Sequence, residues 1–392
     1  MSNPIYLDNQ STTPVDPLVI EAMIPFLTKD FGNPASVHHI YGHKAKQAVE
    51  ESRNLLAGIL SAQPRDIIFT SGATESINLA IKGLCYKQKG KGNHIITQKT
   101  EHKAVLDTCK TMEKKGWEIT YLPVDNDGVL SPESVFDAIK KETVLVAIMH
   151  VNNEIGTIQP IKEIGHICRQ EKIFFMVDAC QSFGKLDIDV LKMNIDLLAA
   201  TAHKIYGPKG IGLLYVSQKE PKVNLQIQID GGGHERGKRS GTLAVHQIVG
   251  LAKAAELAIK NKERENNLIG LLRDRLLKKI RDYHPDIIIN GSLTKRIPQN
   301  LNVCFPGLDA ESIIMKMKNV ACSTGSACSS ANLMPSHVLK ALGLENELAH
   351  SSIRFSLGRF NTEKEINYAA EEIINTITLQ KNRLNQHRLI KD

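Results

Sequence analysis

Two apolar runs on either side of one amphipathic segment constrain the fold more than any other feature of this sequence. The runs are TVLVAIMHV, residues 143–151, and KIFFMVDA, residues 172–179, and the segment IKEIGHICRQEK between them has helical periodicity. Strands that are apolar on both faces belong to parallel sheets covered by helices, because a solvated face would carry alternating polar residues. The sequence therefore predicts an α/β fold built around a parallel sheet.

Helix and strand patterns already alternate upstream of these runs, and the alternation weakens after about residue 260. A charged helical segment, NKERENNLIGLLRDRLLKKI, then leads into a mixed region with strand patterns at NLNVCF and SSIRFSLG and a last long helix. A chain of 392 residues is long enough for two cores. We predict a large α/β domain at residues 16–261 and a smaller α+β domain at residues 262–392, joined by the N-terminal arm 1–15.

Charge and cysteine usage argue against several classes of protein. The net charge is +7, but basic and acidic residues are mixed along the chain, which does not indicate nucleic-acid binding. The seven cysteines include no C-x-x-C pair, so neither a disulfide framework nor an intrinsic metal site is expected. No signal peptide or apolar run of about eighteen residues occurs. These features predict no membrane association and a cytoplasmic location, or an organellar matrix if a presequence has been removed.

Unusual residues follow the predicted strands, and in open α/β sheets ligands bind at the carboxyl ends of the strands. FTSGATES reads as a strand, a glycine turn and a helix that opens at Ala73 and Thr74, which suits an anion such as a phosphate. Asp178 ends the apolar strand FFMVD. A buried carboxylate needs a partner. The partner of Asp178 is either the backbone of the next turn, which the carboxylate would cap, or the positively charged ring of a bound ligand.

Lys204 follows a third apolar strand, in LLAATAHKIYGPKGIG, together with Thr201 and His203. Only about one free lysine in 2,500 is unprotonated at pH 7, so a reactive lysine needs burial or a Schiff base. Taken alone, Lys204 is an ordinary loop lysine. Combined with a phosphate cradle and a carboxylate at Asp178, it meets the three requirements of pyridoxal 5'-phosphate, which needs a lysine, an acid and an anion anchor.

Four further residues are candidates, each with a plainer alternative. His102, in TEHKAV, suits ring stacking and proton transfer, or is a surface histidine in the first turn of a helix. Asn153 follows a strand, and Arg354 lies inside one; the arginine calls for a substrate carboxylate or an internal salt bridge. Cys328 lies in STGSACSSANLMPS, a loop-like stretch of small residues. It is either a reactive thiol or an ordinary exposed one.

Read together, these motifs resemble the group I cysteine desulfurases, in the class V branch of the aminotransferase-fold enzymes. The resemblance runs from YLDNQSTTPVDP to SSIRFSLGRF and is closest to the housekeeping type that supplies iron-sulfur cluster assembly. Its most specific motifs are FTSGATES, TEHKAVLDTC, MHVNNEIGTIQPI, HKIYGPKGIG, GGGHERGKRSGTLAVHQIVG, GSACSS and ELAHSSIRFSLGRF. The resemblance implies an aminotransferase-like fold, whose large domain has a mostly parallel seven-stranded sheet covered by helices.

The resemblance also implies roles for individual residues. It makes Lys204 the Schiff-base lysine of pyridoxal 5'-phosphate, Asp178 the partner of the ring nitrogen and Gln181 the partner of the ring hydroxyl. His102 stacks on the ring and moves protons. The phosphate is held by Ala73, Thr74, Thr201, His203 and, from the other subunit of a homodimer, Thr242. Asn153 contributes to the cofactor site and, together with Arg354, binds the substrate carboxylate.

The implied reaction converts L-cysteine to L-alanine and leaves a persulfide on Cys328, in a mobile loop, for an iron-sulfur scaffold protein and other sulfur acceptors. It further implies that Cys328 transiently ligates an iron-sulfur cluster with that scaffold. Three alternatives remain. The protein is a selenocysteine lyase, or a different β-eliminating enzyme of the same fold, or a sulfur carrier without catalytic activity. Two thiols depart from the family pattern, Cys180 and Cys322, and each is either a packed thiol or a second redox thiol.

Overall fold

The computed structural model describes residues 4–325 and 335–389. The large sheet uses β2 (Ile67–Thr70), β3 (His94–Gln98), β4 (Glu118–Leu122), β5 (Thr143–Met149), β6 (Phe174–Asp178), β7 (Leu197–Thr201) and β8 (Gly212–Val216). The helices around it are α1 (Pro17–Thr28), α2 (Ile40–Ile59), α3 (Ala73–Gln88), α4 (Lys103–Glu113), α5 (Pro132–Asp137), α6 (Ile161–Gln170), α7 (His234–Gly237) and α8 (Val245–Tyr283). Short 3-10 turns lie at Pro64–Asp66 and Ala202–Lys204.

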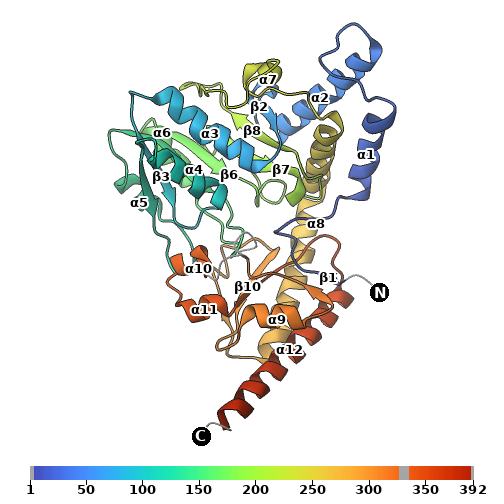
Figure 1. Cartoon of the computed structure of the whole chain (residues 1–392), viewed down its shortest axis with the longest axis vertical. Coiled ribbons are helices and arrows are strands. Elements are labelled where there is room, and N and C mark those ends of the chain that lie inside the picture. The colour runs from blue at the N-terminus through green and yellow to red at the C-terminus, as the bar shows by residue number, and fades with distance from the viewer. Residues whose placement is uncertain (1–3, 326–334, 390–392) are drawn as a thin grey trace.

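The seven strands lie in the order β2-β8-β7-β6-β5-β3-β4. This sheet lies in the upper part of the molecule in Figure 1. From β7 to β4 the neighbouring strands run parallel, while β8 is antiparallel to both β2 and β7. The prediction of a mostly parallel seven-stranded sheet covered by helices is confirmed. Because β6, β5 and β7 lie in the centre and run in one direction, their carboxyl ends meet at one edge of the sheet.

Alternate residues of the central strands pack into two separate apolar clusters, one on each face of the sheet. In β5, Leu145 and Ala147 belong to one cluster and Val146 and Ile148 to the other. Residues of α3 and α4 complete the first cluster, and residues of α1, α2, α5, α6 and the first half of α8 complete the second. The period of two in a pleated strand produces this division, and it explains why the runs read as apolar throughout.

The rest of the chain forms a smaller α+β part with its own apolar cluster. An antiparallel sheet has the order β12-β10-β9, and β1 pairs in parallel with β11. The strands are β1 (Ile5–Tyr6), β9 (Ile288–Ile289), β10 (Asn300–Cys304), β11 (Val320–Ala321) and β12 (Ser352–Ser356), and the helices are α9 (Ala310–Lys316), α10 (His337–Ala341), α11 (Asn346–His350) and α12 (Glu363–Leu389). The predicted smaller α+β part of the fold is confirmed.

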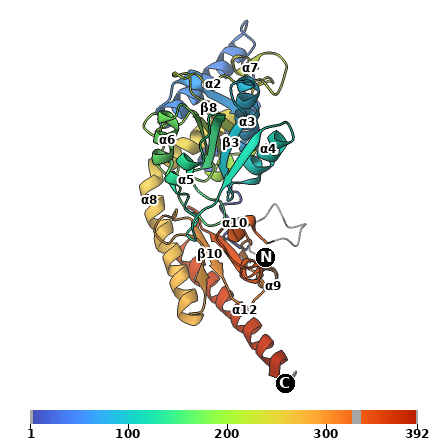
Figure 2. The ribbon, with the colours of Figure 1, turned by 90° about the vertical axis from the view of Figure 1, so that its left-hand side faces the viewer.

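Helix α8 connects the two parts and is longer than the sequence pattern indicated. The charged segment from residue 261 is the second half of one helix that begins at Val245, and it runs along both parts in Figure 2. Its buried residues change from the large cluster to the small one along its length. The domain division at residue 262 therefore falls within a continuous helix, and we keep it as a proposal. In the described part of the chain, no helix has the length and apolarity to cross a membrane.

Candidate active site

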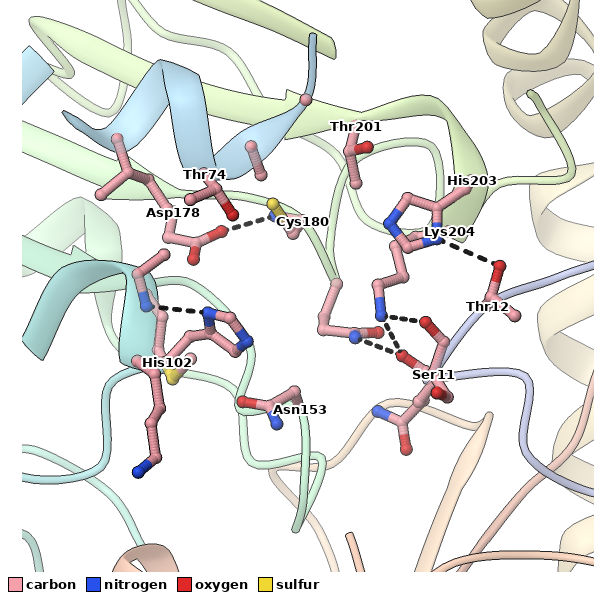
Figure 3. A pocket seen from close by; sticks show the side chains of 18 of the residues that line it. Ser11, Thr12, Thr74, His102, Asn153, Asp178, Cys180, Thr201, His203 and Lys204 are labelled. Carbon is pink, nitrogen blue, oxygen red and sulfur yellow. Dashed lines mark hydrogen bonds between the residues drawn. The ribbon is translucent and has the colours of Figure 1, made fainter. Parts of the chain in front are cut away.

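A cavity of about 770 Å³ opens at the carboxyl ends of the large sheet's central strands, where the smaller part of the fold faces it. Its wall includes the N-terminal segment 10–12 and the turns after β2, β3, β5, β6 and β7 (Figure 3). Arg354 of β12 also lines it. The predicted site residues that line it are Ala73, Thr74, His102, Asn153, Asp178, Gln181, Thr201, His203, Lys204 and Arg354. Parallel strands explain the gathering, because their ends share one edge.

Lys204 lies in the 3-10 turn that follows β7, and its amine points into the cavity (Figure 3). Nζ donates hydrogen bonds to the backbone carbonyl oxygens of Gln10 and Ser11. Burial and the nearby Arg354 guanidinium lower the pKa of Lys204 to about 8. At pH 7 roughly one amine in ten is then neutral, compared with about one in 2,500 for a free lysine. The turn therefore presents a lysine that is far more nucleophilic than an exposed one.

Asp178 is the last residue of β6, and its carboxylate lies at the cavity wall. One carboxylate oxygen, Oδ1, accepts a hydrogen bond of 2.9 Å from the backbone N–H of Cys180. The turn-capping role that the sequence left open is therefore present. The hydrogen bond occupies Oδ1 and fixes the orientation of Oδ2. Asp178 can therefore cap the turn and contact a bound cation at the same time.

His102 is the N-cap residue of α4, and it lines the cavity. Its Nδ1 accepts a hydrogen bond of 3.1 Å from the backbone N–H of Ala104. Because Nδ1 accepts, the proton of the neutral imidazole is on Nε2. Burial lowers the pKa of His102, which favours this neutral form. The ring is thus held in one orientation and one tautomer by the helix that follows it.

The start of α3 has the features of an anion cradle. Its N-cap residue is Gly72, which has no side chain to cap the helix and whose φ of 148° few other residues adopt. The first amide groups, those of Ala73 and Thr74, consequently face the cavity without a side-chain cap. An ion pair of 2.8 Å between Arg239 and Glu75 compensates the one carboxylate in this first turn.

Thr201 and His203 form the opposite side of this cradle. His203 Nδ1 lies 3.1 Å from the hydroxyl of Thr12, and burial lowers the pKa of His203 to about 4. The neutral ring therefore presents a hydrogen-bonding nitrogen rather than a charge. The donors around the cradle are mainly backbone amides, hydroxyls and an imidazole, which suits a phosphate monoester.

Arg354 combines the two alternatives that the sequence left open. Its guanidinium donates a 2.6 Å hydrogen bond to Asp8 Oδ1 and a 2.7 Å hydrogen bond to the backbone carbonyl of Asn153, and it also lines the cavity. The internal salt bridge therefore exists. It holds the guanidinium at the cavity wall, while Nε has no hydrogen-bond partner among the described residues. Because these contacts already fix its side-chain conformation, Arg354 can bind a carboxylate with little further loss of conformational entropy.

Two predicted site residues are not among those that line the cavity. Thr242 is exposed and is not part of the cavity wall. Cys328 lies outside the described residues, but the residues on either side of its segment, Gly325 and Pro335, both line the cavity.

The sequence did not reveal the contribution of the N-terminal arm. Gln10, Ser11 and Thr12 line the cavity, and Asp8 anchors Arg354. The contacts to Lys204 come from backbone carbonyl groups, which leave no side-chain signature in a sequence. Asp8 had a weak signal, since an acid after the apolar pair of a short strand calls for a buried partner.

The two departing thiols are both half-buried, and Cys180 also lines the cavity. Cys180 and Cys322 are free cysteines, and burial raises the pKa of the Cys322 thiol to about 12 and that of the Cys180 thiol well above its ordinary value. A thiol with such a pKa is protonated at neutral pH and is a poor nucleophile. The packing therefore favours the structural interpretation over a redox role for both residues.

Comparison with known proteins decides the family. Residues 5–368 match the family model described as "Aminotransferase class-V". The chain belongs to the class-V aminotransferases. It is 55% identical over 375 residues to the cysteine desulfurase IscS of Vibrio vulnificus strain YJ016, covering 95% of this chain and 92% of the relative. The IscS of Dechloromonas aromatica is also 55% identical, over 94% of this chain and 91% of its own length.

Solved structures agree with this assignment. A NifS-like protein superposes with a TM-score of 0.90 at 35% identity, covering 96% of this chain and all of its own. SspA in complex with cysteine has a TM-score of 0.81 at 40% identity, over 91% of this chain and 99% of its own. The predicted resemblance to the cysteine desulfurases and the predicted fold are both confirmed, and within the class-V family this chain groups with the cysteine desulfurases.

Proposed function

We propose that this protein is a cysteine desulfurase, which converts L-cysteine to L-alanine and transfers the sulfur to Cys328 as a persulfide. The gathering of Lys204, Asp178 and Arg354 around one cavity is the observation that supports this most strongly. A reactive amine, an acid and a carboxylate-binding cation are what the chemistry of an α-amino acid requires. The function is tested by incubation with L-cysteine and a thiol reductant, with alanine and sulfide both measured. Failure to form alanine would contradict it.

We propose pyridoxal 5'-phosphate as the cofactor. The donor set fits it: the cradle at Ala73 and Thr74 with Thr201 and His203 would hold the phosphate, and Lys204 would hold the aldehyde carbon covalently. Asp178 would pair with the ring nitrogen, Gln181 with the ring hydroxyl and His102 with the ring face. When bound, the cofactor withdraws electrons from the substrate's Cα and so weakens the bond to its proton.

The proton transfers fall to Lys204 and His102. Lys204 Nζ, once free, takes the α-proton of the substrate; its lowered pKa of about 8 suits a base that operates near neutral pH. His102 carries a proton on Nε2 and can deliver it within the cavity. His102 can afterwards accept a proton from the substrate thiol or from the product.

The sulfur transfer is a displacement at the substrate's sulfur atom. The Cys328 thiolate attacks that sulfur, so that the new S–S bond forms while the bond between Cβ and sulfur breaks. The electron pair of the broken bond stays with the carbon fragment, which takes up one proton at Cβ, regains one at Cα and leaves as alanine. A free thiol is only about 3% thiolate at pH 7, so the positively charged surroundings of Lys204 and Arg354 would assist its ionisation.

Substitution of Arg354 by glutamine is expected to raise KM for L-cysteine about 10- to 100-fold, with a smaller change in kcat, because a charge-assisted contact to the substrate carboxylate is lost. The single variant also leaves Asp8 without its partner. The double variant Asp8→Asn/Arg354→Gln removes both charges and should keep the raised KM while regaining stability. Arg359→Lys, at an ion pair with Asp16 away from the cavity, is the matched control. An unchanged KM in the double variant would refute the assignment.

We also propose a homodimer, in which Thr242 of one subunit contacts the phosphate bound by the other. An exposed apolar patch on α1, the loop after it and the start of α2 supports this: Leu18, Ile20, Ile24, Leu27, Phe31, Val37, Ile40 and Tyr41. Patches of this kind mark interfaces. The sulfur acceptors, including an iron-sulfur scaffold protein that shares a cluster with Cys328, and the cytoplasmic location are further proposals that rest on the likeness to IscS proteins.

Phe31→Asp is expected to weaken dimerisation at least about 30-fold, because it places a charge in the centre of this patch. Light scattering after size-exclusion chromatography should detect the mass of one chain instead of two at low micromolar concentration. Leu271→Asp, at an exposed leucine on α8 outside the patch, should leave the mass unchanged. If the Phe31→Asp protein kept the mass of two chains, the dimer interface would not lie at this patch.

A further inference from the structure

Lys185 is a half-buried lysine that the proposed mechanism does not use. It lies just after β6, in the turn that carries Cys180 and Gln181, and its amine is enclosed by protein. No carboxylate in residues 4–325 and 335–389 forms an ion pair with it. Burial and the nearby Lys204 lower the pKa of Lys185 to about 7. An enclosed amine without an acid partner is costly to the fold, so a purely structural role is a poor explanation for it.

The amine of Lys185 contacts one residue of the cavity wall. Nζ donates a hydrogen bond of 3.4 Å to Oε1 of Gln181. The other end of this side-chain amide, Nε2, donates a hydrogen bond of 2.9 Å to the backbone carbonyl of Gln10. A protonated lysine can only donate and a carbonyl can only accept, so the two contacts fix which way the amide faces.

The same Gln10 carbonyl also accepts a hydrogen bond from Lys204 Nζ. A chain of contacts therefore runs from Lys185 through the amide of Gln181 and the carbonyl of Gln10 to Lys204. Gln181 is 3% exposed, and it lines the cavity while Lys185 stands behind it. This is the arrangement of a supporting residue, which holds a contact residue in one orientation.

We propose that Lys185 is a positioning residue, which fixes the side-chain amide of Gln181 so that its N–H group meets the ring hydroxyl of the cofactor. This rests on the proposed function, in which Gln181 contacts that hydroxyl. Lys185 thus acts on cofactor binding only through Gln181. Its effect disappears when the amide of Gln181 is absent, whereas an effect of its charge on Lys204 would persist.

The test is a double-mutant cycle on cofactor affinity, which does not depend on turnover. Apoproteins of the wild type, Lys185→Met, Gln181→Ala and the double variant are titrated with pyridoxal 5'-phosphate, and Kd is measured by equilibrium dialysis. Lys185→Met keeps the length and apolar stem of the side chain and removes the donor. We expect it to raise Kd about tenfold in the wild-type background and less than about twofold in the Gln181→Ala background.

Lys192→Met is the control, since that lysine is 83% exposed and pairs with Asp189 at the surface; its Kd should match the wild type. Lys185→Leu replaces Lys185→Met if the latter does not fold. An equal rise in Kd in both backgrounds, or an unchanged Kd with only a lower unfolding temperature of the apoprotein, would overturn the inference. A wild-type protein that binds no cofactor would instead refute the proposed function, so the two failures are distinguishable.

Discussion

Lys204→Ala is expected to lower alanine formation from L-cysteine at least about 10³-fold and to abolish covalent retention of pyridoxal 5'-phosphate. The variant removes both the amine that would hold the cofactor and the base that would take the α-proton, and proton transfer alone is worth about 10²- to 10⁴-fold. The measurement is borohydride reduction followed by peptide mass spectrometry. The wild type should carry the cofactor mass on the peptide that contains Lys204.

Lys204→Arg separates chemistry from packing. An arginine keeps a positive charge near the carbonyl groups of Gln10 and Ser11 but cannot act as the nucleophile or the base. It should therefore fold like the wild type and remain inactive. A sulfur carrier without a cofactor, the alternative from another class, predicts a colourless protein whose spectrum borohydride does not change. That outcome, or full activity of Lys204→Ala, would contradict the proposed role.

Cys328→Ala should reduce formation of persulfide and sulfide at least about 10³-fold, because burial raises the pKa of the Cys180 and Cys322 thiols and keeps both protonated at neutral pH. The expectation rests on the GSACSS motif and on the position of Gly325 and Pro335 at the cavity wall. Sulfide and alanine are measured in parallel after incubation with L-cysteine. Cofactor binding, followed by visible absorbance, should be unchanged, since the variant alters only the sulfur acceptor.

Cys322→Ala provides the matched control. It removes a thiol six residues before Cys328 in the sequence, but burial raises the pKa of that thiol to about 12, so it is protonated and inert at neutral pH. Activity should stay within about twofold of the wild type. If Cys328→Ala still formed sulfide at the wild-type rate, the persulfide role assigned to Cys328 would be wrong.

Local patterns were sufficient for the elements of the large sheet. The runs at residues 143–151 and 172–179 became β5 and β6 because strands covered on both faces by helices must be apolar throughout. The order of the strands could not be read in this way, and neither could the antiparallel direction of β8. Both depend on how the connections cross the sheet, which no local pattern encodes. The length of α8 was also missed, since its two halves are buried in different clusters.

The sequence by itself determined which chemistry is available: a lysine, an acid and a glycine turn, each at or shortly after the end of a strand. Their convergence followed from one rule, that parallel strands end at one edge of the sheet. Only the tertiary structure decided what surrounds them. Gln10 meets Lys204 from 194 positions away, and Asp8 meets Arg354 from 346 positions away. Such contacts join backbone groups or single charges that are far apart in the sequence. They depend on how the chain packs, and no periodic pattern in the sequence encodes them.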